Sequence, residues 1–207
     1  MHRLKGNYTE AIASLSAARE TFNELDRELD VAYCDKDLAL VFYYQENYDD
    51  AADLFTSAQE VFLRLDEPGD AAFCQEKLGD IYRMRGDYHA AETQLESALQ
   101  TYTSLGSMAD IASCSCNLGD VYRSQQRFDA ALECLQVAYD IGQKQGDTLR
   151  IADALRFRSY VHWDQGQFAQ ARQLLLDAQR LYESIGHTRG SKQCVKDLAK
   201  LDRDEQA

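Results

Sequence analysis

The chain has 207 residues and a formal net charge of −13 at pH 7, so it is long enough for one large domain or two small ones. A strongly acidic surface repels phosphate backbones and anionic lipids, which makes nucleic acids and membranes poor partners and favours a partner with some basic character. No apolar run approaches the roughly 20 residues that span a bilayer, and the start has no signal-peptide core, so a cytoplasmic protein is predicted.

An aromatic residue recurs every 40 residues and marks the start of a helix in each copy. The five aromatic residues are Tyr8, Tyr48, Tyr88, Phe128 and Phe168. Alanine follows each of them after three positions, a large apolar residue after seven, and alanine again after ten. These offsets trace one face of a helix. We therefore expect helices over about 9–25, 48–65, 88–105, 128–145 and 168–185.

A second set of helices is expected between these, over about 30–45, 70–85, 110–125, 150–165 and 188–203. Two of these helices contain a Leu-Gly pair, Leu78-Gly79 and Leu118-Gly119. At the repeat position of the glycine, two other copies have the small residues Ala39 and Ser159. Small residues let two helices approach closely. Short polar turns with residues such as Gly86 and Gly146, which tolerate left-handed backbone, separate the helices.

No linker or composition shift divides these segments, so one domain is predicted over residues 1–207. It would consist of a half repeat at 1–29, repeats at 30–69, 70–109, 110–149 and 150–187, and a C-terminal capping helix at 188–207. The expected fold is all-α, an α-solenoid of antiparallel helix hairpins that form a right-handed superhelix, in which each hairpin buries its apolar faces on its neighbours.

The two ends of this array differ. The opening half repeat retains only a tail of its first helix, residues 3–6, so Ala11, Leu15, Ala18 and Phe22 lack cover on one side. We therefore expect either a fragment of a longer protein or self-association through residues 8–22. At the other end, the polar residues of 188–207 suit a cap.

The cysteines follow the repeat. Cys34, Cys74, Cys114 and Cys194 share one repeat position, and Ala154 fills it in the remaining copy. Equivalent residues in successive repeats lie about 20 Å apart at ordinary interhelix spacing, too far for a disulfide. We interpret these thiols as fillers of an inward-facing slot in a reducing compartment.

The order Leu-Gly-x-x-Tyr, then Gly-x-Tyr-x-x-Ala, then a large residue and Ala, is carried best by residues 70–105 and resembles the tetratricopeptide repeat (TPR) signature. The 40-residue unit is longer than the usual 34, and the closing proline is missing. Long repeats of this kind are similar to those of Pins-type adaptors and bacterial peptide-pheromone receptors. The phrase around Cys114 to Asp120 also resembles the TPR arrays of fungal NACHT- or STAND-type proteins.

No catalytic motif, cofactor-binding loop or metal-ligand spacing occurs, so the sequence predicts no enzyme, no catalytic residue, no cofactor and no metal site. His162 replaces the inward tyrosine of other repeats and is interpreted as a hydrogen-bonded packing residue. Asp and Glu residues on helix faces are interpreted as solvated surface.

The TPR resemblance implies that the first helix of each pair lines a concave groove that holds a partner. Mapping by repeat position places fifteen candidate partner-binding residues on that face: Tyr33, Lys36, Tyr43, Tyr44, Phe73, Glu76, Asp80, Arg83, Asn117, Asp120, Arg123, Asp153, Arg156, Tyr160 and Trp163. Aromatic residues and a series of Asp and Arg residues suit a peptide of mixed charge. The alternative is that Asp80–Arg83 and Asp120–Arg123 are ordinary i,i+3 surface pairs.

Two functions stay open at this point. The first is a scaffold or adaptor that grips a peptide or partner protein in the concave groove. The second is a regulatory or oligomerisation arm of a larger STAND-type signalling protein, with no dedicated peptide ligand.

Overall fold

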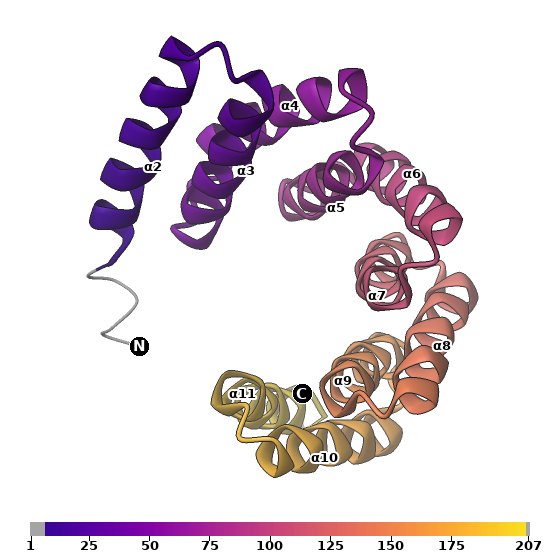
Figure 1. Cartoon of the computed structure of the whole chain (residues 1–207). Coiled ribbons are helices and arrows are strands. Elements are labelled where there is room, and N and C mark those ends of the chain that lie inside the picture. Colours follow the sequence, from indigo (N-terminus) through magenta and orange to yellow (C-terminus); the bar gives the residue numbers. More distant parts are fainter. Residues whose placement is uncertain (1–6, 206–207) are drawn as a thin grey trace. The chain divides into compact units, whose positions relative to one another are not determined.

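The computed structural model describes residues 7–205, and within that range it contains ten helices and no strand (Figure 1). The helices are α2 (Asn7–Glu24), α3 (Glu28–Tyr44), α4 (Tyr48–Arg64), α5 (Pro68–Met84), α6 (Tyr88–Leu105), α7 (Met108–Ser124), α8 (Phe128–Gln145), α9 (Thr148–Asp164), α10 (Phe168–Ser184) and α11 (Thr188–Glu205). The predicted all-α architecture is confirmed, and every predicted helix end lies within two residues of the observed one.

The chain divides into two compact units, residues 1–101 and 102–207, with the boundary inside α6. Helices that follow one another in sequence pack together in each unit: α2 to α5 in the first, and α7 to α11 in the second. We call α3, α5, α7, α9 and α11 the first helices, and α2, α4, α6, α8 and α10 the second helices. The organisation of residues 1–207 as a single array stays a prediction.

The same backbone turn ends each helix from α2 to α10. A residue with left-handed backbone, φ between 53° and 80°, recurs every 20 residues at positions 26, 46, 66, 86, 106, 126, 146, 166 and 186. The N–H group of the residue after it donates to a carbonyl of the last helical turn, as from Asn47 to Phe42 and from Asp147 to Gly142. This is the Schellman arrangement, which satisfies carbonyls that the helix end leaves unpaired.

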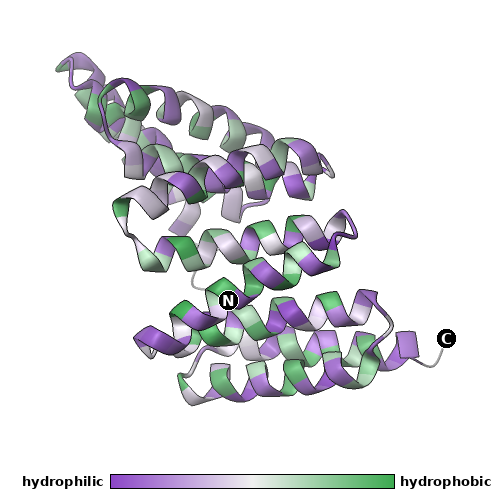
Figure 2. Cartoon of the chain, turned by 90° about the vertical axis from the view of Figure 1, so that its right-hand side faces the viewer, coloured by the Kyte–Doolittle hydropathy of each residue, from purple (hydrophilic) through white to green (hydrophobic). Residues whose placement is uncertain are grey.

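The core lies on the face that the 40-residue pattern predicts. Ala51, Phe55 and Ala58 of α4 are fully buried, and so are Ala171, Leu175 and Ala178 at the same repeat positions of α10. Figure 2 shows hydrophobic and hydrophilic residues interspersed along the helices, as expected where each helix buries only one side.

Small residues allow the close approach of the two helices of a hairpin. A Cβ atom built on Gly79 would lie 2.6 Å from Cγ of Leu95 in α6, and one on Gly119 would lie 2.8 Å from Cγ of Leu135 in α8. Both distances are shorter than van der Waals contact, so these positions need glycine unless the leucine moves.

The cysteines occupy the predicted slot. Cys34, Cys74, Cys114 and Cys194 are buried, as is Ala154 in the remaining copy, and no disulfide joins any of the cysteines in the described range. Burial raises the pKa of Cys74 to about 12 and that of Cys194 to about 11. Thiols with raised pKa values hold little reactive thiolate at neutral pH.

The α2 helix is less covered than its repeat equivalents. Within Asn7–Glu24 no residue is buried, although the equivalents of Ala11, Leu15, Ala18 and Phe22 in α4 are fully buried. This agrees with the incomplete cover expected there. The tail at residues 3–6, on which that expectation partly depends, lies outside the described residues.

The turn geometry leads to a stability prediction at Glu46. Left-handed backbone, φ 64° at Glu46, costs a non-glycine residue about 1–2 kcal/mol. We expect Glu46→Gly to raise the free energy of unfolding by about 0.5–1 kcal/mol, because the added entropy of the unfolded chain offsets part of the relief. Gln45 has ordinary helical backbone, φ −84°, so Gln45→Gly should lower stability instead. Urea denaturation measures the stability of both variants. If both variants lost stability, the left-handed backbone at Glu46 would not be strained.

The burial of the cysteines leads to a labelling prediction. In native protein at pH 8, Cys34, Cys74, Cys114 and Cys194 should react slowly with a maleimide, because they are buried. Cys134 is only partly buried and should react faster. All six should react rapidly in denaturant. Mass spectrometry of timed samples gives the site-specific rates, and equal native rates at Cys74 and Cys134 would refute the placement.

Candidate functional site

All fifteen candidate residues lie on first helices, and we call the surface they form in each unit its first-helix face. The candidates lie on α3 and α5 in the first unit and on α7 and α9 in the second. In the second unit α9 also contacts α7 and α11 directly, so consecutive first helices lie side by side there. The two units are described separately below.

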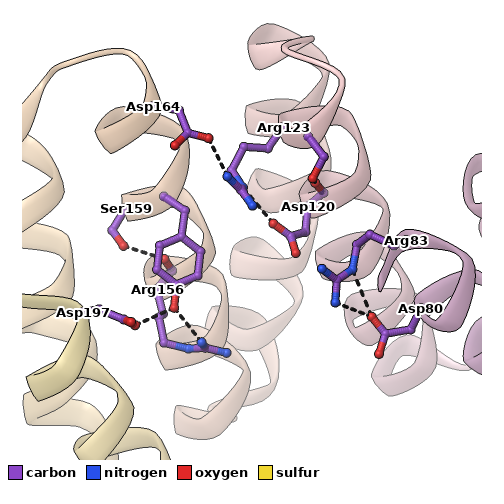
Figure 3. Close-up of polar contacts among 10 residues, drawn as sticks. Asp80, Arg83, Asp120, Arg123, Arg156, Ser159, Asp164 and Asp197 are labelled. Atoms are coloured by element: carbon purple, nitrogen blue, oxygen red, sulfur yellow. Dashed lines mark hydrogen bonds and ion pairs between the residues drawn. The ribbon is translucent and has the colours of Figure 1, made fainter. Parts of the chain in front are cut away.

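In the first unit, a tyrosine joins α3 to α5. The Tyr43 hydroxyl donates a hydrogen bond to the Asp80 carboxylate, to which Arg83 also donates through Nε at 3.0 Å and Nη2 at 2.6 Å (Figure 3 shows the Asp80–Arg83 pair). Burial and the negative charge of Asp80 raise the pKa of Tyr43 well above its ordinary value, so the hydroxyl stays protonated and donates.

Lys36 forms a second connection between the same helices. Its Nζ donates to Asp70 at 2.5 Å, and the Tyr33 hydroxyl donates to the same carboxylate at 3.2 Å. The ammonium also lies over three aromatic rings, 4.7 Å from the centroid of Tyr33, 5.6 Å from Phe62 and 5.7 Å from Phe73. Aromatic faces attract cations. Lys36 therefore fills an aromatic cage of its own unit and is not presented to a partner.

In the second unit, Arg123 joins α7 to α9. Its Nε donates to Asp120 at 2.8 Å and its Nη1 donates to Asp164 at 2.5 Å (Figure 3). Burial alone would lower the pKa of Arg123, but the two carboxylates outweigh it and raise the pKa. The guanidinium is therefore fixed in position and charged, and its Nη2 has no acceptor among the described residues.

Arg156 is the centre of a second network in this unit. Its Nη1 donates to the Tyr160 hydroxyl at 2.8 Å and its Nε to the Tyr182 hydroxyl at 3.3 Å. Each hydroxyl in turn donates to a carboxylate at 2.5 Å, Tyr160 to Asp197 of α11 and Tyr182 to Asp153 (Figure 3 shows the side to Asp197). Two tyrosines thus connect one guanidinium to two carboxylates, and Arg156 makes no ion pair within 4 Å in the part of the chain that the structure describes.

The two arginines flank one aromatic ring. The guanidinium carbon of Arg123 lies 5.8 Å from the centroid of Tyr160, and that of Arg156 lies 5.6 Å from it. We call Arg123, Arg156 and Tyr160 the Arg–Tyr–Arg cluster. It combines an aromatic surface with guanidinium donors held in place by internal hydrogen bonds, an arrangement suited to carboxylates and backbone carbonyls.

The remaining candidates differ in exposure. Tyr44 is the only exposed one of the fifteen, at 55 %, and Met84 at the same repeat position of α5 is also exposed, at 48 %. Glu76 and Asp120 are buried, at 3 % and 6 %, so they are not part of the free surface expected from the sequence. Asn117, Asp153 and Trp163 are partly buried. The i,i+3 pairs Asp80–Arg83 and Asp120–Arg123 are both present.

Sequence reasoning missed several partners in these networks. Asp70, Asp164, Asp197 and the buried Tyr182 were not among the candidates. Three of the tyrosine hydrogen bonds join residues 37 positions apart: Tyr33 to Asp70, Tyr43 to Asp80, and Tyr160 to Asp197. A search for Tyr and Asp at that separation could have found them.

His162 is a packing residue, as predicted. It is buried, its Nδ1 lies 2.6 Å from Oε1 of Gln167, and its Nε2 lies 3.2 Å from Nε2 of Gln170. Over residues 7–205 no group of three His, Cys, Asp or Glu side chains is placed to hold a metal ion. Within the same range, every helix is too short or too polar to cross a bilayer.

Comparison with known proteins gives two family matches. Residues 36–199 match the MalT-like TPR region family, and residues 1–64 match the tetratricopeptide repeat family. No curated protein matches the chain in sequence.

Solved structures share the fold at low identity. BtubC (BKLC) from P. vanneervenii has a TM-score of 0.67 and 16 % identity, covering 97 % of this chain and 92 % of that one. The apo form of RapI has a TM-score of 0.73 and 17 % identity, covering 95 % and 60 %. A Rap protein complexed with Competence and Sporulation Factor has a TM-score of 0.66 and 15 % identity, covering 98 % and 62 %. The chain thus spans about three fifths of these two Rap proteins, and the likeness shows the fold alone.

The contacts of Tyr43 lead to a matched pair of substitutions. Tyr43→Phe removes the hydroxyl that donates to Asp80, and a hydrogen bond to a charged group contributes about 1–2 kcal/mol to stability. The neighbouring Tyr44 is exposed, so Tyr44→Phe should change stability by less than about 0.5 kcal/mol. Chemical denaturation followed by circular dichroism measures both. Equal effects of the two changes would show that the Tyr43 bond contributes nothing.

Proposed function

We propose that this chain, which belongs to the MalT-like TPR region family, is a protein-interaction scaffold that holds a peptide or partner protein on its first-helix face. TPR repeats are generally non-catalytic, and the resemblance implies that first helices line the binding groove. The Rap protein of similar fold was solved in complex with Competence and Sporulation Factor, which supports a binding role for such repeats.

The observation that carries the proposal is the Arg–Tyr–Arg cluster of the second unit. Arg123 and Arg156 are both fixed by internal hydrogen bonds, and each keeps an Nη2 group with no acceptor among the described residues. A fixed guanidinium loses little entropy when it binds, so its remaining N–H groups suit a partner's carboxylate or backbone carbonyl. The Tyr160 ring and nearby Trp163 add apolar surface for a side chain of the partner.

The acidic residues have a smaller role in this proposal than the sequence suggested. Asp80 and Asp120 were expected to meet basic groups of the partner, but each already accepts hydrogen bonds from an arginine and Asp120 is buried. A partner of basic character therefore stays a prediction based on net charge. Self-association through residues 8–22 also stays a prediction, supported by the partly exposed apolar face of α2.

A second function has an observation in its favour. Several polar groups of the first-helix face bond to the next first helix of the same unit, as Tyr43 does to Asp80 and Arg123 does to Asp164. A face that stabilises stacking in this way suits a regulatory or oligomerisation arm of a larger STAND-type protein, in which no fixed peptide is held.

A phage-displayed peptide library separates the two functions. Native chain should enrich a peptide family, and Arg83→Ala with Arg123→Ala should weaken the enriched peptides at least tenfold, which is about 1.4 kcal/mol. Each single variant then shows whether the first or the second unit holds the peptide. Circular dichroism verifies that the helices remain.

The matched control removes two positive charges from second helices. Arg180 is exposed in α10 and pairs with Asp177 in the same i,i+3 geometry, and Lys144 is exposed in α8. Arg180→Ala with Lys144→Ala should leave peptide binding unchanged. If no peptide is enriched by native chain, or both double variants bind the peptides equally, the first-helix face is not the site and the arm becomes the better account.

A further inference from the structure

The last helix carries a row of basic residues on one side. They are separated by three, four, four and three positions, which places them on one face of a helix. All five are exposed: Arg189, Lys192, Lys196, Lys200 and Arg203. We call this row the α11 basic stripe. It occurs in a chain that has 35 acidic and only 22 basic residues.

Three of the four acidic residues of α11 bond to side chains of other helices. Asp197 accepts from the Tyr160 hydroxyl at 2.5 Å, and Arg172 of α10 donates to both Asp202 and Glu205. The side opposite the stripe is buried through residues such as Cys194 and Leu201. Three of the four negative charges of this helix are therefore used inside the unit, whereas its five basic side chains are exposed.

The positive charges of the stripe are not neutralised within the described chain. None of its five side chains has an ion pair within 4 Å among residues 7–205. Asp204 lies one helical turn from Lys200 and does not pair with it. The contacts the stripe does make are a hydrogen bond from Arg203 to the carbonyl of Ala199 and the approach of Lys200 Nζ to 5.4 Å from the Trp163 ring.

Capping alone does not explain the stripe. Lys192 replaces an alanine, Ala32 or Ala72, that is buried in earlier first helices, and a polar residue there keeps an outward face soluble. A cap of mixed charge would achieve the same. Lys192, Lys196 and Lys200 instead follow one another at i,i+4, and like charges at that spacing destabilise a helix. The uniform sign therefore needs a reason beyond solubility.

We propose that the α11 basic stripe docks an acidic segment of a partner protein. From Arg189 to Arg203 the stripe extends over about 21 Å at 1.5 Å per residue, the length of four helical turns. It complements a segment with carboxylates at the same spacing, and the Trp163 ring beside Lys200 offers contact to an apolar side chain. A nucleic acid carries a charge on every phosphate, so the net charge of −13 repels it more strongly than a segment with a few carboxylates.

The test uses a defined probe. A fluorescein-labelled 16-residue helical peptide carries Glu at positions 1, 4, 8, 12 and 15 with one Leu, and a matched peptide carries Gln at those positions. Fluorescence anisotropy with the full chain at 50 mM NaCl should show binding of the Glu peptide and at least tenfold weaker binding of the Gln peptide. Binding should also fall at least tenfold at 300 mM NaCl, because exposed charges are screened.

Variants with three Gln replacements locate the binding. The stripe variant, Lys192→Gln with Lys196→Gln and Lys200→Gln, should weaken binding of the Glu peptide at least tenfold. Arg replacements at the same three positions keep the charge and should retain binding. The control changes Arg64, Lys144 and Arg180 of second helices to Gln and should bind as native chain does. Circular dichroism verifies the fold of each.

Several results would overturn the proposal. The stripe would be a polar cap only if the Glu and Gln peptides bound equally or if the Glu peptide did not bind. The same would follow if the stripe variant and the control variant bound the Glu peptide equally. A salt-sensitive dimer in sedimentation that the stripe variant loses would identify a second copy as the occupant. Tighter binding of a 16-nucleotide single strand than of the Glu peptide would identify a nucleic acid instead.

Discussion

The rest of the structure depends on one repeated constraint, a reversal of the chain every 20 residues. The left-handed residue that follows each helix from α2 to α10 cannot continue it, and the N–H of the next residue closes the end. The helices are therefore all 17 or 18 residues long. Helices of equal length place equivalent residues at equivalent heights, so the same small or large side chain suits the same position in each copy.

Equal length also sets the register between consecutive first helices. Tyr33–Asp70, Tyr43–Asp80 and Tyr160–Asp197 each join residues 37 apart, which is one repeat less three residues. Three residues are nearly one helical turn, so each tyrosine hydroxyl bonds to the next first helix about one turn before its own equivalent. Several polar groups of the first-helix face thereby stabilise the stacking. The groups left for a partner are the unused donors of Arg123 and Arg156 and exposed side chains such as Tyr44.

The fold could be predicted almost completely from sequence, because the 40-residue period fixes helix positions, turns and the buried face at once. The site could be predicted only in part. Comparison of equivalent positions found Tyr43, Asp80 and Arg123. It missed Asp164, which lies one position after the repeat equivalent of Arg123, and Asp197, which lies about one helical turn before the repeat equivalent of Tyr160. One repeat position holds four chemically different residues: Lys36, Glu76, Cys116 and Arg156. Because of this variety, the sequence does not reveal that Glu76 and Cys116 are buried.

The second unit has both paired and unpaired positive charges, and the two would act differently on a partner. The charge of Arg123 is balanced by Asp120 and Asp164, so it acts only at hydrogen-bond distance and gives directional contacts. The α11 basic stripe forms no ion pair within 4 Å among residues 7–205, and its charge acts over about 8–10 Å at physiological salt, which speeds encounter more than it adds affinity. Trp163 belongs to α9, as Tyr160 does, and touches Lys200 of the stripe. An acidic segment drawn to α11 would thus arrive beside the fixed arginines, and one partner could use both surfaces.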